Sequence, residues 1–375
     1  MRSGDTDLRV EAGAIVVLRL YEVAYGIDLP RVEQIAAAQV LAAVSRLRLT
    51  RAEPKAIAFG VPPVEIALGP IDFELDGSRR SAEVTARAYE FGVVSIAVRI
   101  PVTGTPWDEF VDLATAVDRS ASSPAGAEMW GELLERVRRF IGPALDRPSE
   151  TALEEDYLLT IVRSFDSPVT ADDILRRVDL VPLLAGERRE LSEPARRELL
   201  RHSFSYYRND LAVVTWDHAF IYEPSGDMDV ADVLEVANAQ LLELRYYDEL
   251  LDAELPRMYE RVKETRRGLR GLSRGRFANL ARDLHTLVAE VTEITEKVDN
   301  TLKVTEDVYL ARIYGTALEL FRVPVWAASV GRKLDIIRET YTALYDEAAT
   351  ARAELLEAAI VLLIVLEIIL AFVFR

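Results

Sequence analysis

The feature that most constrains this chain is its C-terminal apolar segment, Ala358–Phe374, which holds one charged residue, Glu367, near its middle. As a helix, seventeen residues span about 26 Å at ~1.5 Å per residue, close to the ~30 Å hydrocarbon core of a bilayer. The opening sequence, MRSGDTDLRVEAGA, has no apolar signal core. We therefore predict one transmembrane helix over residues 355–375, with the rest of the chain on the cytoplasmic side of an inner membrane.

The acid inside this segment calls for an explanation, because a carboxylate at the centre of a bilayer costs roughly 2.5–3.5 kcal/mol. One interpretation is a protonated Glu367 that faces lipid and has no function. The other is a helix–helix interface, in which Glu367 faces a neighbouring copy because its own chain offers no second membrane segment. The second interpretation predicts a homo-oligomer in contact with the lipid bilayer.

A change in sequence pattern divides the rest of the chain at residues 224–228, a short linker with Pro, Ser and Gly. Before it, strand-like runs such as AIVVLRLYEVAYGI alternate with helical runs such as DLPRVEQIAAAQVLAAV. This pattern predicts a cytoplasmic α+β domain over residues 1–223, and an internally duplicated split-βαβ arrangement is one form it could take.

Two helix starts inside this domain have capping signals. Thr105 precedes Pro106, a residue favoured at the first helical position. Thr170 is followed three residues later by Asp173, the spacing of a capping box. We predict a helix start at each.

After the linker, apolar residues recur every three or four positions in three long runs. Glycines at 268, 271 and 275 separate the first run from the second, and Pro324 separates the second from the third. The pattern predicts an antiparallel coiled-coil stalk of three helices over residues 229–354, whose last helix continues into the apolar segment.

One polar pair interrupts the first of these seams. Asp248 falls on the apolar stripe, and Arg245 lies one turn earlier. We predict that the two pair and fix the register of the stalk, as buried polar residues do in coiled coils. A catalytic carboxylate at Asp248 is the alternative.

A basic turn stands out against the acidic composition. Residues 261–276, RVKETRRGLRGLSRGR, contain seven basic residues and one acid. The segment is either a membrane-proximal hairpin that contacts anionic lipid, or a solvated turn whose arginines complement a helix C-terminus. A ribosomal or RNA contact is a third option, against which the overall negative charge argues. The arginines concerned are Arg266, Arg267, Arg270, Arg274 and Arg276.

Charge and composition exclude several functions. The net charge of −17 makes a nucleic-acid partner unlikely, and the absence of cysteine excludes thiolate chemistry. No phosphate-binding, nucleophile-elbow or zinc-protease motif occurs, so we expect neither a metal nor a cofactor and favour a non-enzymatic role. His218 is expected in a strand, on the opposite side from Asp217.

The stretches LEVANAQLLELRYYDELLD and RAELLEAAIVLLIVLEIIL resemble the "required for meiotic nuclear division" and sporulation-protein family, a domain of unknown function. Arg245, Tyr247 and Asp248 match that family's Arg–aromatic–Asp core. The resemblance implies an integral membrane protein that forms homo-oligomers and has no established enzymatic activity. Some members support translation in the mitochondrial inner membrane, but this chain has no presequence.

These observations combine into one leading hypothesis, a tail-anchored, homo-oligomeric membrane scaffold that presents its α+β domain to a soluble protein partner. A membrane-attached enzyme or small-ligand sensor is the alternative, and a narrow ion path lined by Glu367 is a third. An arginine-rich, alanine-rich composition favours a bacterial source.

Overall fold

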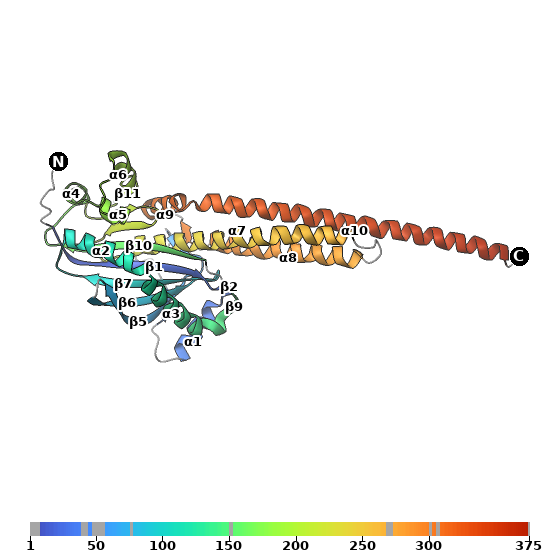
Figure 1. Ribbon diagram of the computed structural model, residues 1–375, viewed down its shortest axis with the longest axis horizontal. Coiled ribbons are helices and arrows are strands. Elements are labelled where there is room, and N and C mark those ends of the chain that lie inside the picture. Colours follow the sequence, from blue (N-terminus) through green and yellow to red (C-terminus); the bar gives the residue numbers. More distant parts are fainter. Residues whose placement is uncertain are drawn as a thin grey trace. The chain divides into compact units, whose positions relative to one another are not determined.

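The computed structural model describes residues 8–38, 44–46, 57–75, 78–149, 153–267, 273–299, 302–304 and 308–373. The chain forms two compact units. We call Met1–Tyr246 with Lys297–Pro324 the sheet unit, and Tyr247–Glu296 with Val325–Arg375 the helical unit. Figure 1 labels most of their elements.

A mixed ten-stranded sheet forms the centre of the sheet unit. Its order is β11-β12-β13-β10-β1-β7-β6-β5-β3, with β8 pairing β1 at one end. The pairings are antiparallel except for β10 with β13, which is parallel. The strands are β1 Arg9–Glu22, β3 Val44–Arg46, β5 Val64–Leu75, β6 Ser78–Ala88, β7 Val93–Val102, β8 Thr105–Pro106, β10 Glu154–Phe165, β11 Ser203–Phe204, β12 Leu211–Val214 and β13 His218–Tyr222.

Strand β1 lies between β7 and β10 and is buried on both faces from Ala14 to Leu18. Such a continuous apolar run is typical of a strand with both faces covered. Helices α2 and α3 cover one face (Figure 1). The other carries the first turns of α7, because Glu22 at the end of β1 contacts Glu243 of that helix.

The remaining elements of the sheet unit are short helices and two small strand pairs. Strands β2 Ala24–Ile27 and β9 Leu145–Pro148 pair with each other, as do β4 Ile57–Phe59 and β14 Leu302–Val304. The helices are α1 Leu29–Ala38, α2 Trp107–Ala121, α3 Pro124–Ile141, α4 Ala171–Arg177, α5 Val181–Ala185, α6 Glu193–Leu199 and α9 Val308–Leu320, with a 3₁₀ turn at Gly142–Ala144.

Both predicted helix starts can be compared with the structure. Helix α4 has the capping box formed by Thr170 and Asp173, so that prediction is confirmed. Helix α2 begins at Trp107 with Pro106 as its N-cap, while Thr105 belongs to β8. The predicted start was therefore one residue early, because pairing with β1 keeps Thr105 extended.

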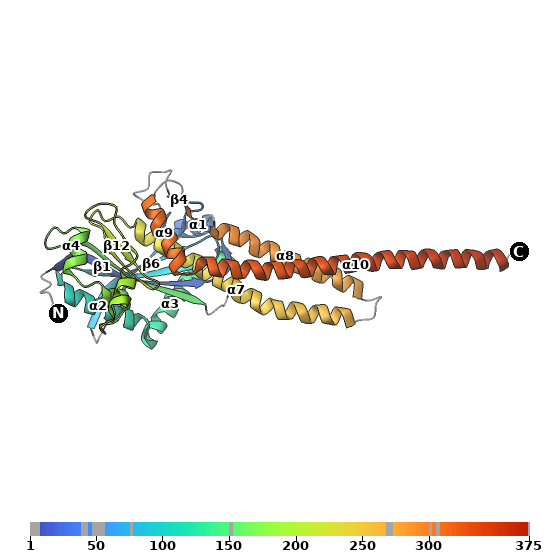
Figure 2. The ribbon, with the colours of Figure 1, turned by 90° about the horizontal axis from the view of Figure 1, so that it is seen from above.

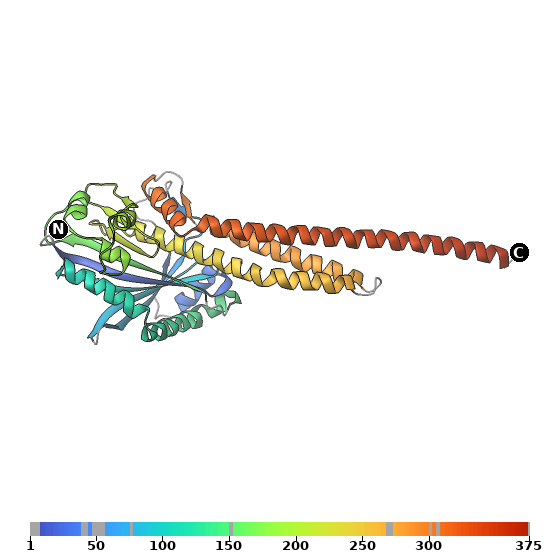
Figure 3. The same cartoon turned by 45° about the horizontal axis from the view of Figure 1, so that its top comes forward.

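Three long helices build the helical unit: parts of α7 Asp229–Arg267 and α8 Ser273–Asp299, and most of α10 Val323–Val373. Figures 2 and 3 show α7, α8 and α10 side by side over part of their lengths. Their buried apolar side chains recur at helical spacing on facing sides. They include Leu251, Met258, Leu280, Leu284, Val288, Val291, Val330, Leu334, Ile337 and Leu344.

The structure contradicts the predicted fold class in two respects. The strands of the sheet unit form one large mixed sheet, in which β1 pairs with both β7 and β10, and not a duplicated split-βαβ pair. Within the described residues, no helix combines the length and the apolar character that a membrane crossing requires. The apolar run is shorter than the ~20 residues of a typical span, and Glu367 interrupts it.

The transmembrane helix predicted over residues 355–375 is therefore wrong. The single-pass inner-membrane location fails with it, as do the tail-anchored membrane scaffold and its membrane-attached enzyme or sensor alternative. The linker at 224–228 and the limits of a stalk over 229–354 stay predictions.

Candidate functional site

The end of α10 presents an apolar surface on all sides. Between Leu356 and Leu370, eleven large apolar side chains are 47–68% exposed. Single exposed apolar residues are normal, but a helix that is apolar all round is buried in stable proteins. We call residues 356–370 the apolar end. Its side chains are Leu356, Ile360, Val361, Leu362, Leu363, Ile364, Val365, Leu366, Ile368, Ile369 and Leu370.

Glu367 lies within the apolar end and is exposed there. It is the one charged residue between Ala358 and Val373. A surface that covers the Glu367 face of the apolar end meets this carboxylate, and burying it without a cation would be costly. A partner with a matching positive charge is therefore favoured.

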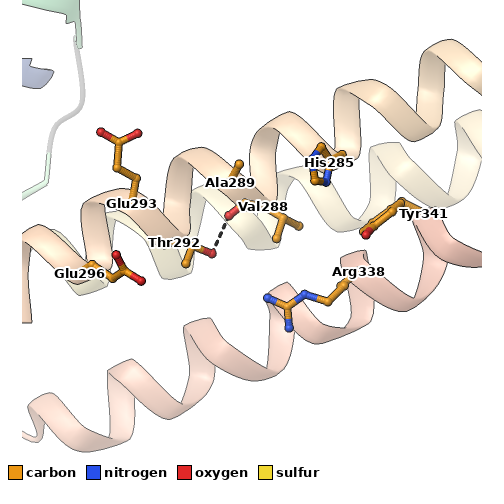
Figure 4. Close-up of a pocket in the computed structure, with 8 residues that line it drawn as sticks. All are labelled: His285, Val288, Ala289, Thr292, Glu293, Glu296, Arg338 and Tyr341. Carbon is orange, nitrogen blue, oxygen red and sulfur yellow. Dashed lines mark hydrogen bonds between the residues drawn. The ribbon is translucent and has the colours of Figure 1, made fainter.

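A groove of about 390 Å³ lies between α8 and α10. In Figure 4, Arg338 and Tyr341 of α10 point toward α8, and the rings of Tyr341 and His285 lie 5.4 Å apart. Its lining includes apolar residues beside charged ones, and apolar grooves are a common site for binding another helix. Its lining residues are His285, Val288, Ala289, Thr292, Glu293, Glu296, Arg338 and Tyr341.

Asp248 forms an ion pair across the helical unit. Its carboxylate lies 2.7 Å from Nζ of Lys333, which also contacts Asp252 at 2.6 Å. Burial acts to lower the pKa of Lys333, but the two aspartates outweigh it and hold the pKa above its ordinary value. The pair joins α7 to α10. Lys333 was not predicted from the sequence as the partner of Asp248, although it directly precedes Leu334 of the apolar stripe.

Arg245 has a different partner from the one predicted. Its guanidinium pairs with Glu155 on β10, within the sheet unit. Arg245 and Asp248 thus contact separate partners in the structure, and their joint role in setting register stays a prediction. The neighbouring acid, Glu154, pairs with Arg19 of β1 at 2.6 Å.

The structure describes little of the basic turn, residues 261–276. Arg270 lies outside the described residues, and the side chains of the other four arginines do so as well. Those four are Arg266 and Arg267 near the end of α7, and Arg274 and Arg276 near the start of α8. Their predicted role stays a prediction.

A buried charge cluster joins α7 to the sheet. One Nη of Arg87 on β6 lies 2.7 Å from Asp232 and 2.6 Å from Glu235, and its Nε contacts Glu65 at 2.9 Å. Burial raises the pKa of Asp232 to about 6, against the opposing effect of Arg87. Tyr89 donates a hydrogen bond to Glu235 at 3.2 Å. We call this the Arg87 cluster.

A second buried pair consists of two acids. Glu22 and Glu243 are both fully buried, and burial raises the pKa of Glu22 to about 8, although its hydrogen bond with Glu243 acts to lower it. The two carboxyl groups therefore share a proton at neutral pH. The turn before β7 passes close to the pair: Gly92 has φ of 99°, and a Cβ there would lie 3.1 Å from Oε1 of Glu22 and 1.8 Å from the carbonyl oxygen of Ala24.

His218 is held between two aspartates. Its Nδ1 lies 2.9 Å from Asp217 and its Nε2 lies 3.8 Å from Asp118. Burial acts to lower its pKa, but the carboxylates outweigh burial and raise the pKa to about 9. The expectation that His218 and Asp217 face opposite sides of a strand is wrong, because Asp217 lies in the turn before β13.

Replacing His218 with Asn should cost about 3 kcal/mol of stability at pH 6. A pKa raised from 6.5 to about 9 means that the folded state binds this proton more tightly. The stabilisation is fully present below pH 6.5 and is lost as pH rises through 9. Urea unfolding of the wild type and His218→Asn at several pH values measures it; a difference that does not shrink above pH 9 would contradict a charged histidine.

The buried clusters of the sheet unit are built from side chains that pair with one another. The Arg87, Glu22 and His218 side chains are each engaged by neighbours inside the fold. Among the described residues, no group of three or more histidines and carboxylates is arranged to hold a metal ion. Sequence reasoning missed the Arg87 cluster, although the three-residue spacing of Asp232 and Glu235 places both on one helix face.

Comparison with known proteins places the similarity in the sheet unit. Residues 12–229 match the family described as "Uncharacterized protein MJ0711, N-terminal domain". Uncharacterized protein MJ0711 of Methanocaldococcus jannaschii is 30% identical over 220 residues, which are 58% of this chain and 66% of that protein. The match thus covers just under two thirds of that relative's length. No solved structure matches the chain significantly.

These findings correct two expectations. The resemblance to the meiotic nuclear division and sporulation family is wrong, because the family whose model matches is that of the MJ0711 N-terminal domain. That resemblance rested on helical stretches after residue 229, whose spacing many helical proteins share. The relative is archaeal, against the bacterial source expected from composition. The family match spans more than half of the residues of this chain, so the chain belongs to the family of the MJ0711 N-terminal domain.

Proposed function

We propose that this protein functions by self-association, and that its copies join through the apolar end of α10. The observation that supports this most strongly is the exposure of eleven large apolar side chains on one short helical segment. An apolar surface of this kind is typical of an interaction site. The sheet unit would be the part that the assembly displays.

The energetics favour association. Each large apolar side chain contributes about 1.5–3 kcal/mol when fully buried, and those of the apolar end are close to half exposed or more in a single chain. Association costs about 4–15 kcal/mol in lost freedom. At about half exposure, eight such side chains, four from each of two copies, contribute about 6–12 kcal/mol, which is the same size as that cost.

The buried clusters of the sheet unit support a non-catalytic role. Glu22, Glu235 and His218 are at most 7% exposed, so a substrate could reach them only if the fold opened. They fix the first turns of α7 and strand β13 on the sheet. The sheet unit is also the part matched by the family, so a function shared with MJ0711 would belong to it.

A single acid placed in the apolar end should break the assembly. Leu363→Glu puts a charge on a side chain that is 61% exposed in the single chain. We expect size-exclusion chromatography with light scattering to show a fall from a multiple of 42.0 kDa toward 42.0 kDa. The matched control is Ala343→Glu, an exposed position on the same helix outside the apolar end. Equal masses for wild type and Leu363→Glu would contradict the proposal.

A further inference from the structure

Arg338 and Glu367 lie on one face of α10. They are 29 residues apart in an unbroken helix, which is eight turns and about 20° of rotation at 3.6 residues per turn. Arg338 is at the groove, and Glu367 is in the apolar end. One helix face therefore carries a positive charge at one place and a negative charge about 44 Å further along.

The face between them carries large, exposed apolar side chains, and Thr342, Ala349 and Arg352 share it. Tyr345, Leu356, Ile360 and Leu363 lie within about 40° of Arg338 around the helix. Their side chains are 66%, 65%, 56% and 61% exposed, respectively. The stripe is mainly apolar, with Arg352 near its middle and an opposite charge at each end. The two end charges match those of a second copy turned end to end.

From this match we infer that two copies pair through α10 in antiparallel orientation, with Arg338 of each copy facing Glu367 of the other. This inference rests on the proposed self-association and adds its register. Because residue 338 faces residue 367, the numbers of any two facing residues add up to 705. Tyr345 therefore faces Ile360, and Ala349 faces Leu356. The arrangement has two-fold symmetry, so both partners use the same surface.

Charge decides between the two orientations. In a parallel pair, Glu367 would face Glu367 and Arg338 would face Arg338, and like charges would repel at both places. In the antiparallel pair, each Glu367 meets an Arg338, and Arg352 is close to Arg352 of the other copy in either orientation. The lone acid in the apolar run thereby has a partner.

The groove fits the same arrangement. The register brings the partner's Leu363 and Ile364 next to Tyr341, where the α8 side of the groove carries His285 and Val288. The acids Glu293 and Glu296 lie toward the far end of the groove from Tyr341 (Figure 4). The apolar part of the groove thus receives the apolar end, as in helix-in-groove recognition.

Charge reversal tests the register in the full-length protein. Arg338→Glu and Glu367→Arg each place two like-charged pairs in the dimer, so each should raise the dimer dissociation constant at least about tenfold. The double variant restores opposite charges, and its constant should return to within about threefold of the wild type. Arg332→Glu, an exposed reversal about 120° around the helix, is the control and should have little effect.

Disulfide trapping provides a second test that does not depend on those charges. The chain has no cysteine, so introduced cysteines are the only ones present. The pair Tyr345→Cys with Ile360→Cys lies about 22 Å apart within one helix, too far for an internal disulfide. Mild oxidation should link copies into covalent dimers, whereas Tyr345→Cys alone should not link them.

The outcomes separate the two proposals. A wild-type protein that stays at 42.0 kDa would overturn self-association and the register together. A multimer in which Tyr345→Cys alone forms a disulfide has a parallel arrangement and would overturn the register only. Failure of the double charge reversal to restore association would do the same.

Discussion

Arg87→Met is expected to destabilise the sheet unit by about 3–5 kcal/mol. The substitution keeps an apolar stem like that of arginine and removes the charged guanidinium. Asp232 and Glu235 would then be buried beside each other without a cation. Urea unfolding followed by the fluorescence of the buried Trp107 and Trp130 measures this loss.

The control for this prediction is Arg79→Met. Arg79 is an exposed arginine on the same strand and is paired with Asp72 at 4.0 Å. Surface pairs of this kind contribute about 0–1 kcal/mol, so we expect little change. Similar losses for the two variants would show that the Arg87 cluster does not hold α7 on the sheet.

Glu22→Gln is expected to stabilise the protein at alkaline pH by about 3–5 kcal/mol. The pKa of Glu22 rises from 4.5 to about 8 on folding. The folded state therefore binds more protons between these values, and stability falls as pH rises through this range, by up to about 1.4 kcal/mol per unit. A neutral amide in place of Glu22 should remove this part of the pH dependence.

The measurement is the free energy of unfolding of the wild type and Glu22→Gln from pH 4 to pH 9. His218 contributes pH dependence in the same direction, so the difference between the two proteins is what isolates Glu22. Glu83→Gln, an exposed acid on β6, is the matched control. A constant difference across the range would contradict a shared proton between Glu22 and Glu243.

Local capping signals in the sequence predicted one of two helix starts correctly. The Thr170–Asp173 spacing predicted the capping box of α4, because that motif depends on four neighbouring residues alone. The start of α2 was misplaced by one residue, since the pairing of Thr105 with Val10 of β1 decides it. Signals that depend on distant partners were the ones that failed.

Long-range pairing explains most of what was missed. Periodicity cannot show that β1 inserts between β7 and β10, or that Leu302–Val304 pairs with β4 of the sheet unit. Arg87 and Asp232 are 145 residues apart, and Lys333 and Asp248 are 85 residues apart. The charges of each pair meet only after α7 has packed on the sheet or on α10.

The apolar end of α10 is another segment for which prediction from the sequence alone failed. Hydropathy alone predicted a membrane helix, whereas the described structure has no helix that meets the requirements for crossing a membrane. The sequence does place Arg338 and Glu367 29 residues apart, which is about eight turns of a helix. That relation becomes visible once α10 is known to be unbroken between them.

Sedimentation equilibrium of the full-length protein over a range of concentrations tests self-association most directly. The antiparallel arrangement predicts a mass that rises with concentration and levels off at twice 42.0 kDa. A single species of 42.0 kDa at every concentration would contradict it.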